Sequence, residues 1–484
     1  MTSTSVFEIS RQDVQKLEIP ALASITNVKH LSSYNWIEAD NSTPIIAVPG
    51  SPARWSPPAA PRRLNKDSGL IYIAQNAARH PQSPLEPLFR ALYVTNPAFD
   101  IRSTDVVTDR NNIRKLLSFI NPGSTRNGRE PFTMNIETTK NTAIFCRDEA
   151  KITEYLGPHE FRGFGHEFEK AYTTAEVDGS TGHHRIISYR FGDLNFIVRH
   201  ETDGYVDTHT RTSSSNVKTV TQDDLSNLLG TLSLSSAQTS PSITCAGSKL
   251  MIKEDGQPVP LESTLEIKTR VSHKPLDFEE VAPQLWASQT PKLVRAYHRN
   301  GTFQRPVVED VTAVTKIWEE RKQSDLRRLA ALIRKIVNHV KECGGNAVLK
   351  YNVEGDKLVV SKAERKAMLP KDLYSKWDDE QRHPVNTDTR NDSVLATGTT
   401  EVGQQSIPAV RISQNYRYHS ADVETYRCEV QRLIPKLQSE LELWIIVFMS
   451  PRFHTWHPLF KCKKPPPQRQ LSSFMTRSLS LMSL

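Results

Sequence analysis

The sequence lacks the features that define several protein classes. Its five cysteines are scattered along 484 residues without a Cys-x-x-Cys pair, which disfavours both a zinc site of the usual spacing and a disulfide framework. Its longest apolar run, LWIIVFM near residue 446, is far shorter than the roughly 20 residues that span a bilayer. The first residues, MTSTSVFEISRQDVQ, contain no apolar core of a signal peptide. We therefore expect an intracellular protein, nuclear or cytoplasmic, with no membrane contact.

Acidic residues are fewer than basic ones, but the difference is modest. The chain has 54 Asp and Glu against 62 Lys and Arg, a net charge of +8. Such an excess fits a polyanionic partner such as nucleic acid, although many basic proteins bind none. With 37% hydrophobic and 24% charged residues, the composition is that of a globular protein with polar additions.

Composition divides the chain into three parts. Residues 1–70 are rich in Pro, Ser and Thr and predict an irregular covering segment with one short strand at PIIAVPG. Residues 71–377 form the expected compact domain, interrupted at 207–247 by a Ser/Thr-rich insertion with one short helix at DDLSNLLG. Residues 378–484 are polar and end in a basic, low-complexity stretch, which predicts a disordered tail.

Helical and strand patterns follow one another within the compact part. Apolar residues at helical spacing predict a helix in TDRNNIRKLLSFI, capped by Thr108 or Asp109, and a longer one in LRRLAALIRKIVNHVKEC. Turn residues predict hairpins at residues 132–148, at residues 185–206 and around Asp255-Gly256. The segment GPHEFRGFGHEFEKAYTT predicts a helix with a core-facing stripe of Phe161, Phe164, Phe168 and Tyr172. These patterns predict a mixed α/β fold with a central sheet flanked by helices.

Two otherwise apolar strands carry charges at alternate positions. Glu201 and Asp203 lie two residues apart in NFIVRHETDGYV, and Glu266 and Lys268 do so in ESTLEIKTRV. Each pair projects from one face of its strand, because successive side chains point to opposite faces. An uncompensated buried charge is costly, so these groups need either mutual pairing or a bound cation.

Each charged pair alone is weak evidence, because cross-strand ion pairs on a solvated face explain it equally well. The combination is more specific. A Glu-x-Asp strand end, a turn and then an apolar strand with Glu-x-Lys is the layout of the PD-(D/E)XK nuclease core. Magnesium prefers oxygen ligands and takes a few carboxylates. A metal held there can activate water and stabilise charge on a phosphodiester, and an adjacent lysine can assist.

A third motif precedes these strands. GFGHEFE contains Gly165-x-x-Phe168-Glu169, and with it the chain resembles the decapping exoribonuclease (DXO-like) family, which trims aberrant or non-canonically capped RNA 5′ ends. The resemblance covers roughly residues 70 to 350. It implies a PD-(D/E)XK-like fold, with Glu169, Asp203 and Glu266 as ligands of Mg²⁺ or Mn²⁺. It also implies Glu201 close to these ligands and Lys268 at the catalytic water.

Two further segments match this family pattern. VVTDRNNIRKLL resembles its arginine-bearing helix start, which makes Arg110 the candidate contact to the substrate phosphate. LWASQTPKLVRAYHRNGTF resembles its Trp-and-Gln helix, which makes Gln289 the candidate contact to RNA or to the active site. We expect the carboxylates of Glu169, Asp203 and Glu266 to approach one point, somewhat splayed without a cation because like charges repel.

The sequence therefore favours a divalent-metal-dependent phosphodiesterase that acts on RNA 5′ ends, with a possible protein partner in RNA decay. The alternative is a catalytically quiet RNA- or partner-binding protein on the same fold. A prenyl diphosphate synthase is a remote alternative, because Asp223-Asp224 and Asp378-Asp379 lack the later Asp of an Asp-Asp-x-x-Asp motif. For His183-His184 and for arginines such as Arg162, Arg185, Arg199 and Arg270, surface positions are the expectation.

Overall fold

The computed structural model of the chain describes residues 6–40, 42–124, 129–157, 159–207, 243–244 and 247–378. All of them belong to the compact unit Met1–Val385. The predicted helix at DDLSNLLG, nearly all of the insertion at 207–247, and the predicted tail after residue 378 lie outside the described residues.

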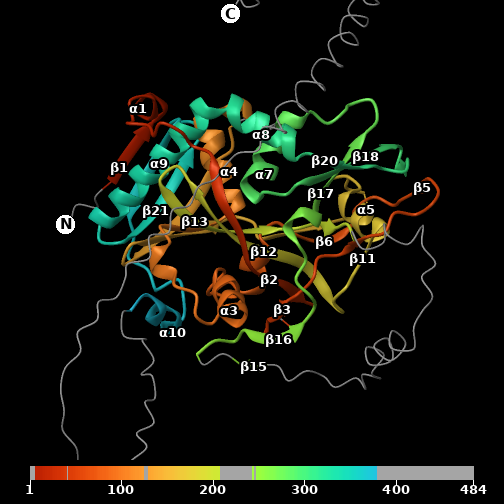
Figure 1. Ribbon diagram of the computed structural model, residues 1–484, viewed down its shortest axis with the longest axis horizontal. Helices are drawn as coiled ribbons and strands as arrows, with labels where there is room; N and C mark the ends of the chain where they lie inside the picture. Colours follow the sequence, from red (N-terminus) through yellow and green to blue (C-terminus); the bar gives the residue numbers. More distant parts are fainter. Residues whose placement is uncertain are drawn as a thin grey trace, which may run out of the picture. The chain divides into compact units, whose positions relative to one another are not determined.

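The larger sheet is mixed and has twelve strands (Figure 1). Strand β13 pairs with β12 in an antiparallel hairpin and with β7 in parallel. The strand order across the sheet is β1 (Val6–Ser10), β22 (Lys357–Lys362), β21 (Asn346–Asn352), β8 (Phe132–Thr139), β9 (Thr142–Asp148), β7 (Val106–Asp109), β13 (Leu194–Glu201), β12 (Ser180–Phe191), β2 (Ile25–Ile37), β3 (Ile45–Pro49), β16 (Met251–Asp255) and β15 (Ile243–Thr244).

A second sheet has eight strands. Its order is β11 (Thr173–Thr174), β4 (Arg54–Trp55), β14 (Gly204–Tyr205), β17 (Thr264–Val271), β18 (Lys292–Arg299), β19 (Thr302–Phe303) and β5 (Arg62–Arg63), with β20 (Val308–Asp310) also paired to β18. A two-stranded ribbon joins β6 (Gly69–Tyr72) to β10 (Thr153–Leu156).

Helices cover both faces of the larger sheet, as Figure 1 shows. One face packs against α4 (Arg110–Ile120), α7 (Phe278–Ser288), α8 (Thr312–Arg321) and α9 (Gln323–Glu342). The other packs against α3 (Glu86–Thr95) and α10 (Lys371–Tyr374). The other helices of the described residues are α1 (Arg11–Gln15), α2 (Gln75–Arg79) and α5 (Gly165–Tyr172), with 3₁₀ turns at Ile101–Ser103, Pro122–Ser124, Leu261–Ser263 and Ser375–Trp377. The predicted mixed fold with flanking helices is confirmed. Within the described part of the chain, no helix combines the length and apolarity that a membrane crossing requires.

The N-terminal segment is not an irregular covering. Its predicted strand at PIIAVPG exists as β3, but the 13-residue strand β2 lies beside it, between β3 and β12. Strand β2 shows no clear alternation because its second half is buried on both faces and includes polar residues. Ser32 and Ser33 are buried there, and their hydroxyls donate to the carbonyls of Ala91 and Pro49, each at 2.8 Å.

Most local predictions in the compact part are confirmed. The turns at Lys140-Asn141 and Gly192-Asp193 join β8 to β9 and β12 to β13. The predicted hairpin around Asp255-Gly256 is wrong, because β16 pairs with β3 in the larger sheet and β17 belongs to the second sheet. Both strands are present, but their partners lie elsewhere in the chain.

Candidate active site

The acids of the Glu-x-Asp motif lie where the chain passes from one sheet to the other. Glu201 is the last residue of β13 in the larger sheet, and β14 begins at Gly204 in the second. Gly204 pairs with Leu265 of β17, so the short crossing segment runs directly beside the Glu-x-Lys strand. Asp203 is fixed there because its Oδ2 accepts a hydrogen bond from the backbone N–H of Ile267 at 2.7 Å.

Strand β17 alternates as predicted. Leu265 and Ile267 are 0% and 4% exposed and pack in an apolar cluster with α5. Glu266, 2% exposed, accepts hydrogen bonds from Lys268, from Gln284 on α7 and from Arg110 at the start of α4, the last at 3.1 Å. Three elements thus converge on one carboxylate, and charge-assisted bonds of this kind are the strong ones.

Helix α5 supplies the fourth carboxylate. Phe168 and Tyr172 are fully buried in the same cluster as Leu265 and Ile267, and they hold the helix against β17. Glu169 follows Phe168 on this helix and is half-buried. Its pKa is raised well above the usual value by burial, and then by the charges of Asp203 and Glu201. Glu169 therefore lies within the same electrostatic cluster as the acids of the two strands.

The four acids differ in protonation because their surroundings differ. Burial, and then the charge of Glu266, raises the pKa of Asp203 to about 8. Glu201 reaches solvent at the mouth of the site, yet dehydration by the surrounding protein still raises its pKa. Burial alone would raise the pKa of Glu266 too, but Lys268 and Arg110 lower it to about 2. Glu266 is thus the permanently charged acid of the cluster.

The donor set fits a divalent cation by charge, although it does not form a finished metal cage. Four carboxylates face one ammonium (Lys268) and one guanidinium (Arg110), so full ionisation leaves four minus two, or two, negative charges. Within the described ranges, no three His, Cys, Asp or Glu side chains are placed to hold a metal ion as they stand. The predicted convergence of three carboxylates on one point is therefore not met. Glu266 is turned to its cationic partners, as expected where carboxylates repel.

The raised pKa of Asp203 predicts how stability changes with pH. An Asp whose pKa rises on folding stabilises the fold while protonated, and this contribution is lost as pH rises toward the folded pKa, here from the ordinary 3.8 to about 8. We expect the melting temperature of EDTA-treated protein to fall across this window. Asp203→Asn should make that slope shallower. A wild-type slope no steeper than that of Asp203→Asn would contradict the buried, proton-binding Asp203.

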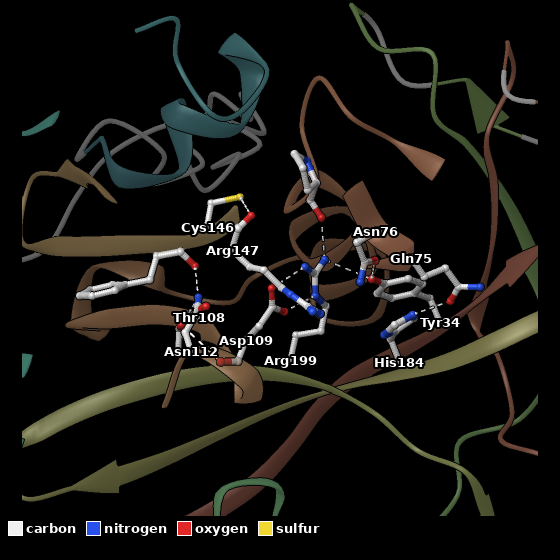
Figure 2. Close-up of polar contacts among 12 residues, drawn as sticks. Tyr34, Gln75, Asn76, Thr108, Asp109, Asn112, Cys146, Arg147, His184 and Arg199 are labelled. Atoms are coloured by element: carbon white, nitrogen blue, oxygen red, sulfur yellow. Dashed lines mark hydrogen bonds and ion pairs between the residues drawn. The ribbon is translucent and has the colours of Figure 1, made fainter. Parts of the chain in front are cut away.

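A pocket of about 250 Å³ lies on the Glu201 side of these acids. Figure 2 shows polar contacts in and around this pocket, among residues of β2, α2, β7, α4, β9, β12 and β13. Arg110, Arg114, Arg147, Arg199 and Glu201 are among its lining residues. The pocket lies at the ends of the parallel strands β7 and β13, which is where ligand sites commonly form in α/β sheets.

A bidentate ion pair forms one wall of this pocket. The Nε and Nη2 atoms of Arg199 donate to the two carboxylate oxygens of Asp109 at 2.7 and 3.0 Å (Figure 2). The remaining nitrogen of Arg199 donates to the carbonyl of Pro84 and to the hydroxyl of Tyr34. Asp109, one of the two predicted cap residues, is the N-cap residue of α4, but its carboxylate makes no capping bond because Arg199 engages it. The pair fixes the first turn of α4, which carries Arg110.

One predicted site residue is replaced by a neighbour in the same helix. Gln289 caps the C-terminus of α7 in a left-handed conformation, and its Nε2 donates to the carbonyl of Trp286 at 2.5 Å. It lines a different pocket, beside Pro291 and Lys316, so it is not part of the acidic cluster. Gln284, one turn earlier, is the glutamine that contacts Glu266. The only sequence signal for it was a polar residue within the apolar stretch VAPQLWA of this helix.

Several residues expected at the surface are buried. His183, His184, Arg185 and Arg199 are at most 5% exposed. Burial lowers the pKa of both histidines well below the usual value, so they are neutral polar core residues. His184 shares a hydrogen bond with Gln75 at 3.0 Å (Figure 2).

Comparisons with known proteins place the chain in a family. A family model described as Domain of unknown function (DUF8563) matches residues 5–377. The chain belongs to this family. No curated protein matches it.

Solved structures of Rai1 and Dxo1 are similar to the chain. Rai1 of S. pombe is 13% identical, with 74% of this chain and 100% of that chain covered and a TM-score of 0.45. Rai1 of Candida albicans in complex with pU5–Mn²⁺ is 11% identical, with coverages of 77% and 99% and a TM-score of 0.47. Dxo1 of K. lactis in complex with manganese is 10% identical, with coverages of 75% and 99% and a TM-score of 0.40. The case for a function rests on the side chains of the site.

Proposed function

We propose that this protein is a divalent-metal-dependent phosphodiesterase that acts on RNA 5′ ends. The observation that carries the proposal is the electrostatic cluster of Glu169, Glu201, Asp203 and Glu266, in which Glu266 pairs with one lysine and one arginine beside an arginine-lined pocket. An excess of acids costs stability in a purely structural cluster. The same excess of negative charge suits a site that binds a divalent cation for hydrolysis.

The residues that would hold the metal are Glu169, Asp203 and Glu266, with Glu201 beside them. When bound, a divalent cation supplies activation of water and charge stabilisation at a phosphodiester. Lys268 has a raised pKa, because Glu266 and Asp203 outweigh the opposing effect of burial. Lys268 therefore stays protonated and can stabilise a developing negative charge at the phosphate.

Two further residues act through or beside these acids. Gln284 is a positioning residue, because its amide fixes the carboxylate of Glu266 from helix α7. Arg110 both pairs with Glu266 and lines the adjoining pocket, where its guanidinium can contact a substrate phosphate. The pocket, about 250 Å³ in volume, receives the terminal unit of the RNA in this proposal. The domain bounds 71–377 remain a prediction. Residues 6–70, which we expected to cover that domain, contribute strands to both sheets.

A second candidate function is RNA or partner binding without catalysis. Two observations favour it: among the described residues the acids form no ready metal cage, and Glu266 is already held by three donors. This candidate predicts RNA binding that does not respond to divalent metal and no cleavage in its presence.

The experiment that tests the proposal uses the ligands found with Candida albicans Rai1, a 5′-phosphorylated oligouridylate and Mn²⁺. Purified protein and 5′-labelled RNA are incubated with Mn²⁺, Mg²⁺ or EDTA. The proposal predicts release of the labelled 5′ end with a divalent metal and none with EDTA. RNA that stays intact with both metals would contradict the nuclease proposal and would favour the candidate that only binds RNA.

Arg110→Ala is expected to weaken binding of 5′-phosphorylated RNA more than that of 5′-hydroxyl RNA. The loss should shrink as salt rises, because phosphate contacts release counterions. Fluorescence anisotropy in EDTA measures both ligands, and Arg102→Ala, an exposed arginine paired with Asp100, is the matched control. Equal losses for the two RNAs would show that Arg110 does not contact the terminal phosphate.

A further inference from the structure

A basic groove lies beside the proposed site. Its volume is about 740 Å³, and its lining includes Arg63, Lys66, Arg162, Arg270 and Lys274. No acid lines it within the described part of the chain. The groove between β1 and α9 is a useful contrast, because there Glu18, Asp193 and Glu342 accompany Arg334 and Lys335. The one-sided charge therefore belongs to this groove and does not follow from the net charge of the chain.

Three of the groove's cations have no acidic partner among the described residues. Arg63, Lys66 and Lys274 are exposed, and no ion pair forms at any of them in that part of the chain. Arg162 pairs with Glu154 at 2.7 Å and Arg270 with Glu280 at 2.6 Å. These cations are available to an anionic ligand, and three of them in one groove of about 740 Å³ suit a chain of phosphates better than one small ion.

An exposed aromatic ring lies among these charges. Phe161, predicted to be core, is 57% exposed because α5 begins only at Gly165 and leaves residues 159–164 outside the helix. The ring is nevertheless held in place. It meets Phe164 edge-on with centroids 5.5 Å apart, and the ammonium of Lys66 lies 5.4 Å from its centroid. A fixed, exposed ring beside cations is the arrangement on which single-stranded bases stack.

The groove is joined to the acidic cluster by strand β17. Lys268 and Arg270 line a pocket next to Glu266, together with Gln284. Arg270, Thr269 and Val271 then line the basic groove. Val271 is five residues beyond Glu266, about 16 Å at a strand rise of roughly 3.3 Å per residue. That distance corresponds to roughly five stacked nucleotides at 3.4 Å each.

We propose that this groove binds the single-stranded body of an RNA whose 5′ end lies at the acidic cluster. Phe161 stacks on a base, and Arg63, Lys66 and Lys274 contact phosphates. A duplex is excluded from this mode because its bases are already stacked and offer Phe161 no face. This inference rests on the proposed function for the placement of the 5′ end. It adds a substrate requirement, a single-stranded stretch long enough to reach from Glu266 to the groove at Val271.

The test is RNA binding in EDTA, measured by fluorescence anisotropy with 5′-phosphorylated RNAs of about 3 and about 12 nucleotides and a duplex of the longer one. Phe161→Ala should weaken binding of the longer single strand about tenfold. Lys66→Gln should reduce the slope of log affinity against log salt by about 0.7. Neither should change binding of the short RNA. Tyr155→Ala, at an exposed tyrosine on β10, and Lys350→Gln, at an exposed lysine on β21, are the matched controls.

Wild-type affinity of both groove variants for the longer strand would overturn the inference. So would equal losses for the short RNA, or a duplex bound as tightly as the single strand with the same dependence on Phe161. Failure here is distinguishable from failure of the proposed function. If the protein cleaves RNA with Mn²⁺ but its RNA binding does not depend on the groove residues, only the groove inference is wrong. If RNA binding depends on the groove residues but no metal supports cleavage, only the proposed nuclease activity is wrong.

Discussion

Glu266→Gln should abolish metal-dependent release of RNA 5′ ends while leaving RNA binding at wild-type strength. Glu266 is the one acid of the cluster whose pKa is lowered, to about 2, so it provides a permanent negative charge for a cation. The amide keeps the shape of the side chain but removes that charge and the ion pairs with Lys268 and Arg110. We expect a loss of at least about 100-fold in single-turnover cleavage.

The matched control is Glu262→Gln, at an exposed acid four residues earlier in the chain, which should cleave like the wild type. Thermal melting of both variants verifies that they fold. Equal cleavage by wild type and Glu266→Gln would point to a contaminating nuclease and would remove the evidence for this site.

Asp109→Ala should produce the largest loss of stability of any substitution proposed above. It would leave the guanidinium of Arg199, 2% exposed, without its counter-ion. Breaking a buried pair by removing one partner costs about 3–5 kcal/mol, which corresponds to a fall in melting temperature of roughly 10 °C. The loss should also disorder the first turn of α4, which carries Arg110, so RNA binding should weaken in parallel.

Asp193→Ala is the control for this substitution, because its pair with Arg334 at 2.9 Å is exposed on both sides. Exposed pairs contribute about 0–1 kcal/mol, so its melting temperature should stay close to that of the wild type. Melting curves followed by circular dichroism measure both variants. Similar melting temperatures for the two would mean that the Asp109–Arg199 pair does not stabilise the fold.

Local patterns were sufficient for the elements whose partners are near in sequence. The alternation of Leu265 and Ile267 with Glu266 and Lys268 determines which face of β17 enters the core, and the structure has that alternation. The same local logic fails for β16 and β17, which look like a hairpin but pair with β3 and β18. It also fails for β2, because the carbonyls that satisfy Ser32 and Ser33 come from distant segments.

The site shows the same limit at the level of single residues. The charged strand motifs identify Glu201, Asp203 and Glu266 because their costly positions are visible in the sequence itself. Which glutamine of α7 reaches Glu266 depends on the rotation of that helix, so Gln284 could not be separated from Gln289. Similarly, Phe161 leaves the core only because α5 starts late, at Gly165.

Anomalous diffraction from crystals soaked in Mn²⁺ is the most direct test of the central claim, that these acids form a metal site. The account predicts an anomalous peak in contact with carboxylates of Glu169, Asp203 and Glu266, with Lys268 adjacent. The same soak of Glu266→Gln crystals should reduce or remove this peak. No peak among these acids at saturating Mn²⁺, in crystals of the wild-type protein, would contradict the account.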